Sequence, residues 1–119
     1  MLWRGLMATG MALALASGPA QARVAKEMSG IAAFYDKGYR GLTASGARYD
    51  PNKFTCAHRT LPFGTHVLVT DVRTHRSVTV TVNDRGPFNK GRVIDLSLAA
   101  AKALRMTDRG LIRVTAVVQ

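Results

Sequence analysis

The feature that most constrains the fold is a pair of alternating segments in the middle of the chain. Residues 76–82 carry valine at every second position with mainly hydroxyl-bearing residues between, and residues 66–72 alternate in a similar way. A period of two directs the two sets of side chains to opposite faces of a β-strand. The link between the segments, residues 73–75, is short, so the two strands are predicted to form a hairpin.

The rest of the chain contains further short strands and one helix. Three segments have the composition of strands: residues 29–35, 93–96 and 111–118. Gly, Ser, Asp and Pro predict a loop over 36–51 and a turn at 83–88. Ser97 is a favourable N-cap for an Ala-rich helix over 98–105. Short strands with few helices favour a small closed β-barrel, because closure leaves no exposed sheet edge.

The N-terminus has the features of a secretory signal peptide rather than of the fold. Arg4 is followed by a short apolar run and then by Ala20-Gln21-Ala22, an A-x-A cleavage site. The run is shorter than the roughly 20 residues that a spanning helix needs. We therefore predict a signal peptide over 1–22, a flexible lead-in over 23–28 and one domain over 29–119, in the periplasm and without a membrane anchor after cleavage. An uncleaved membrane anchor is the alternative interpretation.

The balance of charged residues points to an anionic partner. The chain has 17 Lys and Arg against 7 Asp and Glu, a formal net charge of +10. A basic surface attracts polyanions. An exported protein meets anionic cell-wall polymers or lipid headgroups rather than nucleic acid, so no nucleic-acid partner is expected. Charge that serves only solubility is the alternative explanation. The lone cysteine, Cys56, allows no intramolecular disulfide and is interpreted as a small buried side chain rather than a nucleophile.

Four sequence segments together resemble the rare lipoprotein A (RlpA-like) family. They are GIAAFY at 30–35, TASG at 43–46 leading to YD at 49–50, AHRTLPFGT at 57–65, and VNDRGPF at 82–88 followed by GRVIDLS at 91–97. The resemblance covers roughly residues 29–118. It implies a mainly β fold, a small six-stranded double-psi β-barrel with one or two short helices. It also implies a lytic transglycosylase that acts on peptidoglycan and prefers glycan strands stripped of stem peptides.

Two features of the chain depart from that family. Many relatives carry a lipobox cysteine and a C-terminal glycan-binding domain, and this chain has neither. Relatives also often have Glu three residues before the aspartate of the YD pair, where this chain has Ala47. The alternative function is therefore a non-catalytic glycan-binding module, as in expansins. A secreted inhibitor or effector on the same barrel is a third hypothesis, which no residue singles out.

Carboxyl groups are the candidate catalysts. A lytic transglycosylase can work with one well-placed acid, whose pKa burial or a like charge must raise. Asp95 lies between two apolar residues of a predicted strand, and Asp84 ends another strand beside a Gly-Pro turn. The pair matches the aspartate pair of expansin-like barrels, where the second is the proposed acid. The alternatives are that Asp84 pairs with Arg85 or caps its turn, and that Asp95 caps the following helix.

Asp50 and His58 complete the predicted catalytic set. Their spacing of eight residues is the one at which RlpA-like proteins carry residues needed for activity. A histidine with a pKa near neutrality can shuttle a proton or orient a carboxylate. The alternative is a structural role, with Asp50 forming an Asx-turn at Asp50-Pro51-Asn52.

Aromatic and basic side chains are the candidates for binding the glycan. Tyr35, Tyr39 and Phe88 could stack on sugar rings, and Arg59, Arg85 and Arg92 could bind carboxylates or hydroxyls, although packing or surface charge would equally explain each. The three His and one Cys lack metal-ligand spacing, so neither a metal site nor a cofactor is predicted.

Overall fold

The computed structural model describes residues 26–119. The predicted signal peptide, and the part of the predicted lead-in before Lys26, lie outside the described residues. The elements are β1 (Glu27–Phe34), β2 (Thr55–Ala57), β3 (His66–Asp71), β4 (Ser77–Asp84), β5 (Arg92–Leu96), α3 (Leu98–Ala103) and β6 (Ile112–Val118). Among the described residues, no helix has the length and apolar character needed to cross a bilayer.

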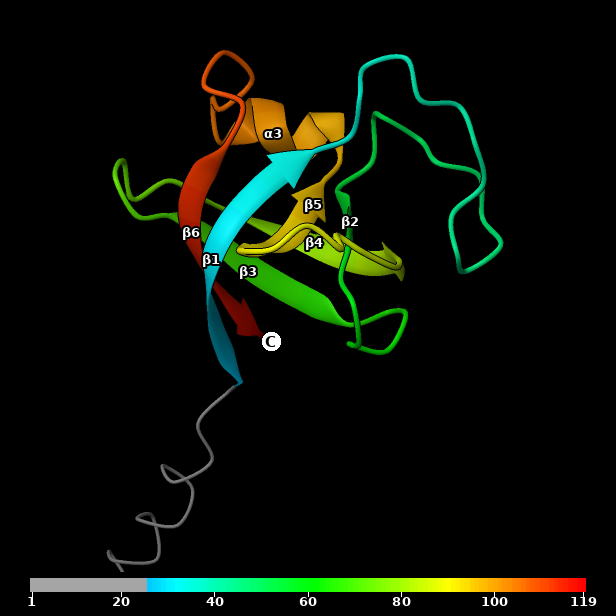
Figure 1. Cartoon of the computed structure of the whole chain (residues 1–119), viewed down its shortest axis with the longest axis horizontal. Coiled ribbons are helices and arrows are strands. Elements are labelled where there is room, and N and C mark those ends of the chain that lie inside the picture. Colours follow the sequence, from blue (N-terminus) through cyan, green and yellow to red (C-terminus); the bar gives the residue numbers. More distant parts are fainter. Residues whose placement is uncertain (1–25) are drawn as a thin grey trace, which may run out of the picture.

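The strands close into one barrel in the order β1-β5-β2-β4-β3-β6 (Figure 1). Two pairs run parallel, β1 with β5 and β2 with β4, and the other four pairs are antiparallel. Because parallel neighbours cannot be joined by a tight turn, the chain crosses between them through long connections. The closed six-stranded barrel with one short helix confirms the fold class that the sequence predicted.

The core follows the alternation of the strands. In β4, Val80 and Val82 are buried while Thr79 stays at the surface, as the period of two predicted. The predicted hairpin is confirmed by antiparallel pairing of β3 with β4. The helix α3 lies over one end of the barrel (Figure 1). Its predicted cap is confirmed, because the Ser97 hydroxyl accepts a hydrogen bond from the Ala100 backbone N–H at 3.2 Å.

Several predicted boundaries were wrong. β1 begins at Glu27, so Glu27 and Met28 of the predicted flexible lead-in belong to the barrel and pair with β6. β4 continues to Asp84, two residues into the predicted turn. The helix ends at Ala103, and Arg105 has a φ of 55°, which does not continue a helix. The three-residue strand β2 was not predicted, because it is too short to show an alternation.

Candidate functional site

Two carboxyl groups lie in one row of side chains across four strands of the barrel. Asp95 on β5 is directly opposite Ala33 on β1 and Ala57 on β2, and Ala57 is in turn opposite Asp84 on β4. Residues directly opposite one another project from the same face of a sheet. In the row Ala33–Asp95–Ala57–Asp84, one small residue therefore separates the two aspartates, and the register between β2 and β4 shifts just before the Ala57–Asp84 pair.

Asp84 is held by three hydrogen-bond donors. Its Oδ2 accepts from the Tyr35 hydroxyl at 2.5 Å, and its Oδ1 accepts from the backbone N–H groups of Ala44 at 2.7 Å and Arg85 at 2.8 Å. Tyr35 follows the end of β1, so its phenol joins the first strand of the row to the last. All three partners donate, which is the arrangement that suits an ionised carboxylate.

Asp95 has the opposite environment. Its Oδ1 is buried and has no hydrogen-bond partner among the described residues. Burial raises the pKa of Asp95, the Arg92 guanidinium opposes that rise, and the negative charge of Asp84 adds to it. The two carboxyl groups therefore differ in environment: burial raises the pKa of Asp95, whereas Asp84 accepts hydrogen bonds from three donors.

The three tyrosines of the chain gather beside this row. The rings of Tyr35 and Tyr49 are stacked with centroids 4.3 Å apart, and Tyr39 packs 5.5 Å from each of them. The Tyr49 hydroxyl accepts a hydrogen bond from the Leu98 backbone N–H at the start of α3. Burial raises the pKa of Tyr35, and its hydrogen bond to Asp84 raises it further, so the phenol keeps its proton. Tyr39 is 36% exposed and is the tyrosine available for stacking on a ligand.

The connection between β1 and β2 fastens onto the end of β4. The Ala44 contact to Asp84 is accompanied by a hydrogen bond from the Ser45 backbone N–H to the Asn83 carbonyl. Within this loop the buried Thr43 donates through its hydroxyl to the Ala47 carbonyl at 2.7 Å. Ala47 is exposed on the same loop, so a longer side chain at that position would have room.

Asp50 and His58 are both engaged in local structure. Asp50 Oδ1 accepts from the Asn52 backbone N–H at 2.9 Å, which is the Asx-turn considered above. His58 is buried, and its Nδ1 accepts from the backbone N–H groups of Thr60 and Leu61. Burial lowers the pKa of His58, and the nearby cations, Arg59 first, lower it further. Its backbone N–H donates to the Asp84 carbonyl, so His58 fixes the strand end that carries Asp84.

The three predicted arginines differ in whether their guanidinium groups already have hydrogen-bond partners. Arg59 donates to the carbonyls of Pro87 and Arg92, and Arg85 donates to those of His58 and Leu61. The Arg85 guanidinium also lies 4.1 Å from the centre of the Phe63 ring. The guanidinium of Arg92, by contrast, makes no hydrogen bond or ion pair within residues 26–119.

Phe88 and Cys56 are at opposite extremes of exposure. Phe88 is 79% exposed on the connection between β4 and β5, where its ring is accessible to a ligand. Cys56 is fully buried in the core, as predicted, and burial raises the pKa of its thiol to about 12, with the Asp95 charge contributing. The thiol is therefore not a nucleophile near neutral pH. Within the described part of the chain, no group of three or more His, Cys, Asp or Glu side chains could hold a metal ion.

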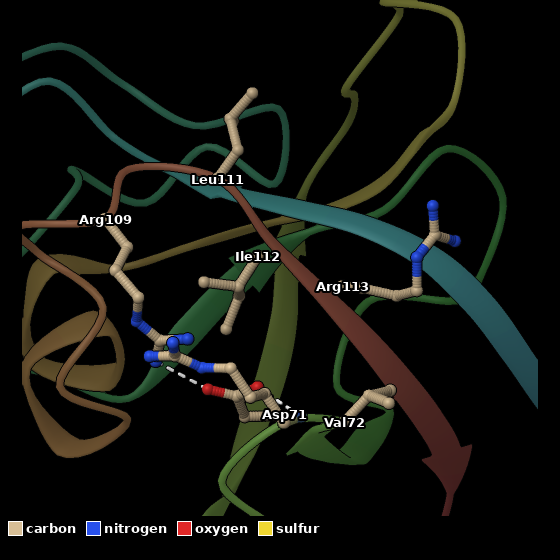
Figure 2. A pocket seen from close by; sticks show the side chains of 7 residues that line it. Asp71, Val72, Arg109, Leu111, Ile112 and Arg113 are labelled. Carbon is tan, nitrogen blue, oxygen red and sulfur yellow. Dashed lines mark hydrogen bonds and ion pairs between the residues drawn. The ribbon is translucent and has the colours of Figure 1, made fainter.

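A separate pocket of about 320 Å³ lies between the β3–β4 hairpin and the start of β6. Figure 2 shows its main polar contact, the ion pair between Arg109 and the buried Asp71, with Arg113 directed away from it. Burial acts to raise the pKa of Asp71, but the hydrogen bond from Arg109 and others bring it below its usual value. The Arg109 and Asp71 charges neutralise one another. Their ion pair joins the β3–β4 hairpin to the segment that precedes β6.

Sequence reasoning missed the parts of the site that depend on strand pairing. Ala57, which separates the two aspartates, lies on the strand that was not predicted. The Tyr49 ring stacks on the ring of Tyr35. Its place in the Tyr49-Asp50 pair was the only sequence feature that could have identified Tyr49 as part of the site. Tyr35 was predicted to bind sugar, whereas its hydroxyl is used by Asp84.

Comparisons with solved structures agree with the barrel. The chain is similar to a Streptomyces papain inhibitor, with a TM-score of 0.65 and 26% identity, covering 81% of this chain and 96% of that protein. An expansin from Clavibacter michiganensis, solved in complex with cellohexaose, matches with a TM-score of 0.61 and 22% identity, over 79% of this chain and half of that protein. At this identity the expansin supports the fold alone.

Sequence comparisons identify the family. A protein from Synechocystis named as a probable endolytic peptidoglycan transglycosylase RlpA is 50% identical over 93 residues, which are 77% of this chain and 29% of that protein. The endolytic peptidoglycan transglycosylase RlpA of Pasteurella multocida is 53% identical over 83 residues, 69% of this chain and 28% of that protein. The chain thus spans less than a third of the length of these relatives. The family described as lytic transglycolase matches residues 27–116, nearly all of the barrel, and the chain therefore belongs to this RlpA-like, double-psi β-barrel family.

Proposed function

We propose that this chain cleaves the glycan strands of peptidoglycan as a lytic transglycosylase, with Asp95 as the acid. The observation that carries the proposal is the environment of Asp95, a carboxyl with a buried, unpartnered oxygen and a raised pKa in one row with Asp84. Membership of the lytic transglycolase family and the named activity of the RlpA relatives support it.

In the proposed reaction, the Asp95 carboxyl protonates the glycosidic oxygen beside N-acetylmuramic acid, and the bond from that oxygen to C1 breaks. The C6 hydroxyl of the same sugar attacks C1, and its proton passes to the Asp95 carboxylate. The acid is thereby regenerated and a 1,6-anhydro end is left, without consumption of water. The nucleophile is intramolecular, so proximity lowers the barrier. Asp84 would stabilise positive charge that develops on the sugar.

Asp50 and His58 act in this proposal through the structure around them. His58 holds the backbone of Asp84, and the Asx-turn of Asp50 orients Pro51, whose carbonyl accepts from the Ala99 backbone N–H. Loss of the Asp50 side chain would release the Asx-turn before α3, and loss of the His58 imidazole would release the turn that it holds through the Thr60 and Leu61 N–H groups. Tyr39 and Phe88 supply exposed rings on which sugars could stack.

The proposal is tested by mass spectrometry of glycan strands that lack stem peptides, after incubation with the protein. The expected product ends in 1,6-anhydro-N-acetylmuramic acid, and Asp95→Asn should lower its formation by roughly 10²–10⁴-fold. Asp108→Asn, an exposed aspartate on the connection between α3 and β6, is the matched control and should cleave normally. Product with a reducing end would mean that water attacks and the protein is a hydrolase.

The expansin-like alternative predicts a different outcome of the same experiment. If the wild-type protein binds the strands and releases no product, the chain is a glycan-binding module. Ala47→Glu is then the informative substitution, because Ala47 is exposed on the loop that contacts Asp84. A gain of product in this variant would assign the lost activity to that position.

Export to the periplasm is also part of the proposed function. It is supported by the A-x-A site at Ala20-Gln21-Ala22 and by the peptidoglycan activity named for the relatives. N-terminal sequencing of protein from a periplasmic extract should begin at Arg23. A full-length chain found in the membrane fraction would contradict cleavage.

A further inference from the structure

Arg92 is the one guanidinium of the three predicted binders that is left for a ligand. The Arg59 and Arg85 side chains are both occupied by backbone carbonyls, whereas the Arg92 guanidinium has no partner among residues 26–119. Arg92 is also half-buried at the start of β5, so its charge is less screened than that of a fully exposed side chain. An unpaired, partly desolvated cation beside a candidate active site favours an anionic ligand.

A pocket of about 370 Å³ lies at this guanidinium. Its walls include Arg92, Ala33, Tyr35, Gly110 and Leu111. Ala33 is the residue directly opposite Asp95, and Tyr35 is the residue that bonds Asp84, so the pocket adjoins the row of the two carboxyl groups. The pocket thus offers one cation, the exposed carboxylate of Asp36 and several apolar side chains next to the place where the glycosidic bond would be cleaved.

We propose that this pocket binds the free lactyl carboxylate of N-acetylmuramic acid, with Arg92 as its counter-ion, and so selects strands without stem peptides. The proposal rests on the proposed function and adds the basis of its substrate preference. A stem peptide converts the lactyl carboxylate into a neutral amide. Removal of the peptide restores a carboxylate, which a guanidinium can bind through two parallel hydrogen bonds. The lactyl methyl group suits the apolar surface of Ala33 and Leu111.

Two other charges near the pocket bear on this proposal. Asp36 also lines the pocket, but it is exposed and its Oδ1 accepts from the Gly38 backbone N–H, so solvent screens its repulsion of an anion. Asp95 feels Arg92 as a charge that lowers its pKa. A substrate carboxylate that neutralises Arg92 would remove this effect and favour the protonated acid. The correct strand would then assist its own cleavage.

The test compares two forms of the same glycan strands, one with free lactyl carboxylates and one in which methylamine has converted them to amides. Binding is measured on protein carrying Asp95→Asn, which leaves the strands intact. We expect the carboxylate form to bind about 10-fold more tightly, as one charge-assisted hydrogen-bonded pair provides. Adding Arg92→Gln should bring the ratio close to one, and Arg92→Lys, which keeps the charge, should retain part of it.

A matched control removes the same charge elsewhere. Arg113 is exposed on β6, so Arg113→Gln should weaken binding of both forms through net charge and leave their ratio unchanged. A wild-type ratio near one, or a ratio that survives Arg92→Gln, would overturn the proposal. If Arg92→Gln fails to fold, the ratio in the parent and in Arg92→Lys still decides.

The failure of this proposal differs from failure of the proposed function. Cleavage of both strand forms at equal rates by protein with Asp95 intact would overturn the carboxylate site and leave the transglycosylase activity standing. Preferential binding of the carboxylate form without any anhydro product would support the site and overturn the activity. Binding of neither form, together with no anhydro product from protein with Asp95 intact, would overturn both.

Discussion

Asp95→Asn should change the pH dependence of stability in a way that reports the burial of this carboxyl without any substrate. Burial raises the pKa of Asp95 above its value of about 3.9 in an unfolded chain. A group with a raised folded-state pKa contributes stability that is fully present below the unfolded pKa and is lost as pH rises through the folded pKa. The free energy of unfolding of the wild type, relative to Asp95→Asn, should therefore fall as pH rises above about 4.

The size of the effect follows from the structure. One proton bound differently in the two states changes the free energy of unfolding by at most about 1.4 kcal/mol per pH unit. A buried polar atom without a partner, such as Asp95 Oδ1, costs about 1–3 kcal/mol. Because Asp95 is only half-buried, solvent reduces this cost and we expect a total change of about 1–2 kcal/mol.

The assay is urea denaturation of both proteins at closely spaced pH values between 4 and 8. The difference between them removes the contributions of groups that the substitution leaves alone. Asp108→Asn is the control, since an exposed aspartate should give a difference that hardly depends on pH. The pH at which the Asp95 difference levels off reports the folded-state pKa of the carboxyl.

Two results would refute this reasoning. A difference that stays constant from pH 4 to pH 8 would mean that the Asp95 carboxyl titrates alike in the folded and unfolded chains. A difference that rises with pH would mean that the attraction of Arg92 outweighs burial and holds the acid ionised. Either result would remove the physical basis for Asp95 as the proton donor.

Three further predictions concern other side chains. Tyr35→Phe removes the hydrogen bond to Asp84 but keeps the ring stacked on Tyr49, so kcat should fall about 10-fold with KM unchanged. An equal loss of kcat in Tyr39→Phe would argue against a specific role of the Tyr35 hydroxyl. Arg109→Gln leaves the buried Asp71 without its ion-pair partner and should lower the free energy of unfolding, measured by urea denaturation, by about 3 kcal/mol. A loss under about 1 kcal/mol would show that the Asp71 charge finds another partner. Cys56, fully buried with a thiol pKa of about 12, should react with a disulfide reagent only in urea, and rapid reaction in the folded protein would contradict its burial.

Local sequence patterns predicted the elements whose signal is contained in a few neighbouring residues. The alternation of valines located β4, the short link identified the hairpin, and Ser97 marked the start of α3. These features depend on backbone periodicity and on one cap, which adjacent residues determine. The motifs VNDRGPF and GRVIDLS likewise identified the segments that carry Asp84 and Asp95, together with the family.

The relation between those segments was decided by closure of the barrel. No local pattern shows that Ala57 separates Asp84 from Asp95, because β2 has three residues and its two partners come from distant parts of the chain. The same holds for the arginines, which look alike in sequence. Arg59 and Arg85 meet backbone carbonyls contributed by other segments, and Arg92 does not. These hydrogen bonds form only after distant strands have paired, and so does the burial that raises the pKa of Asp95. Only the tertiary structure could therefore assign them.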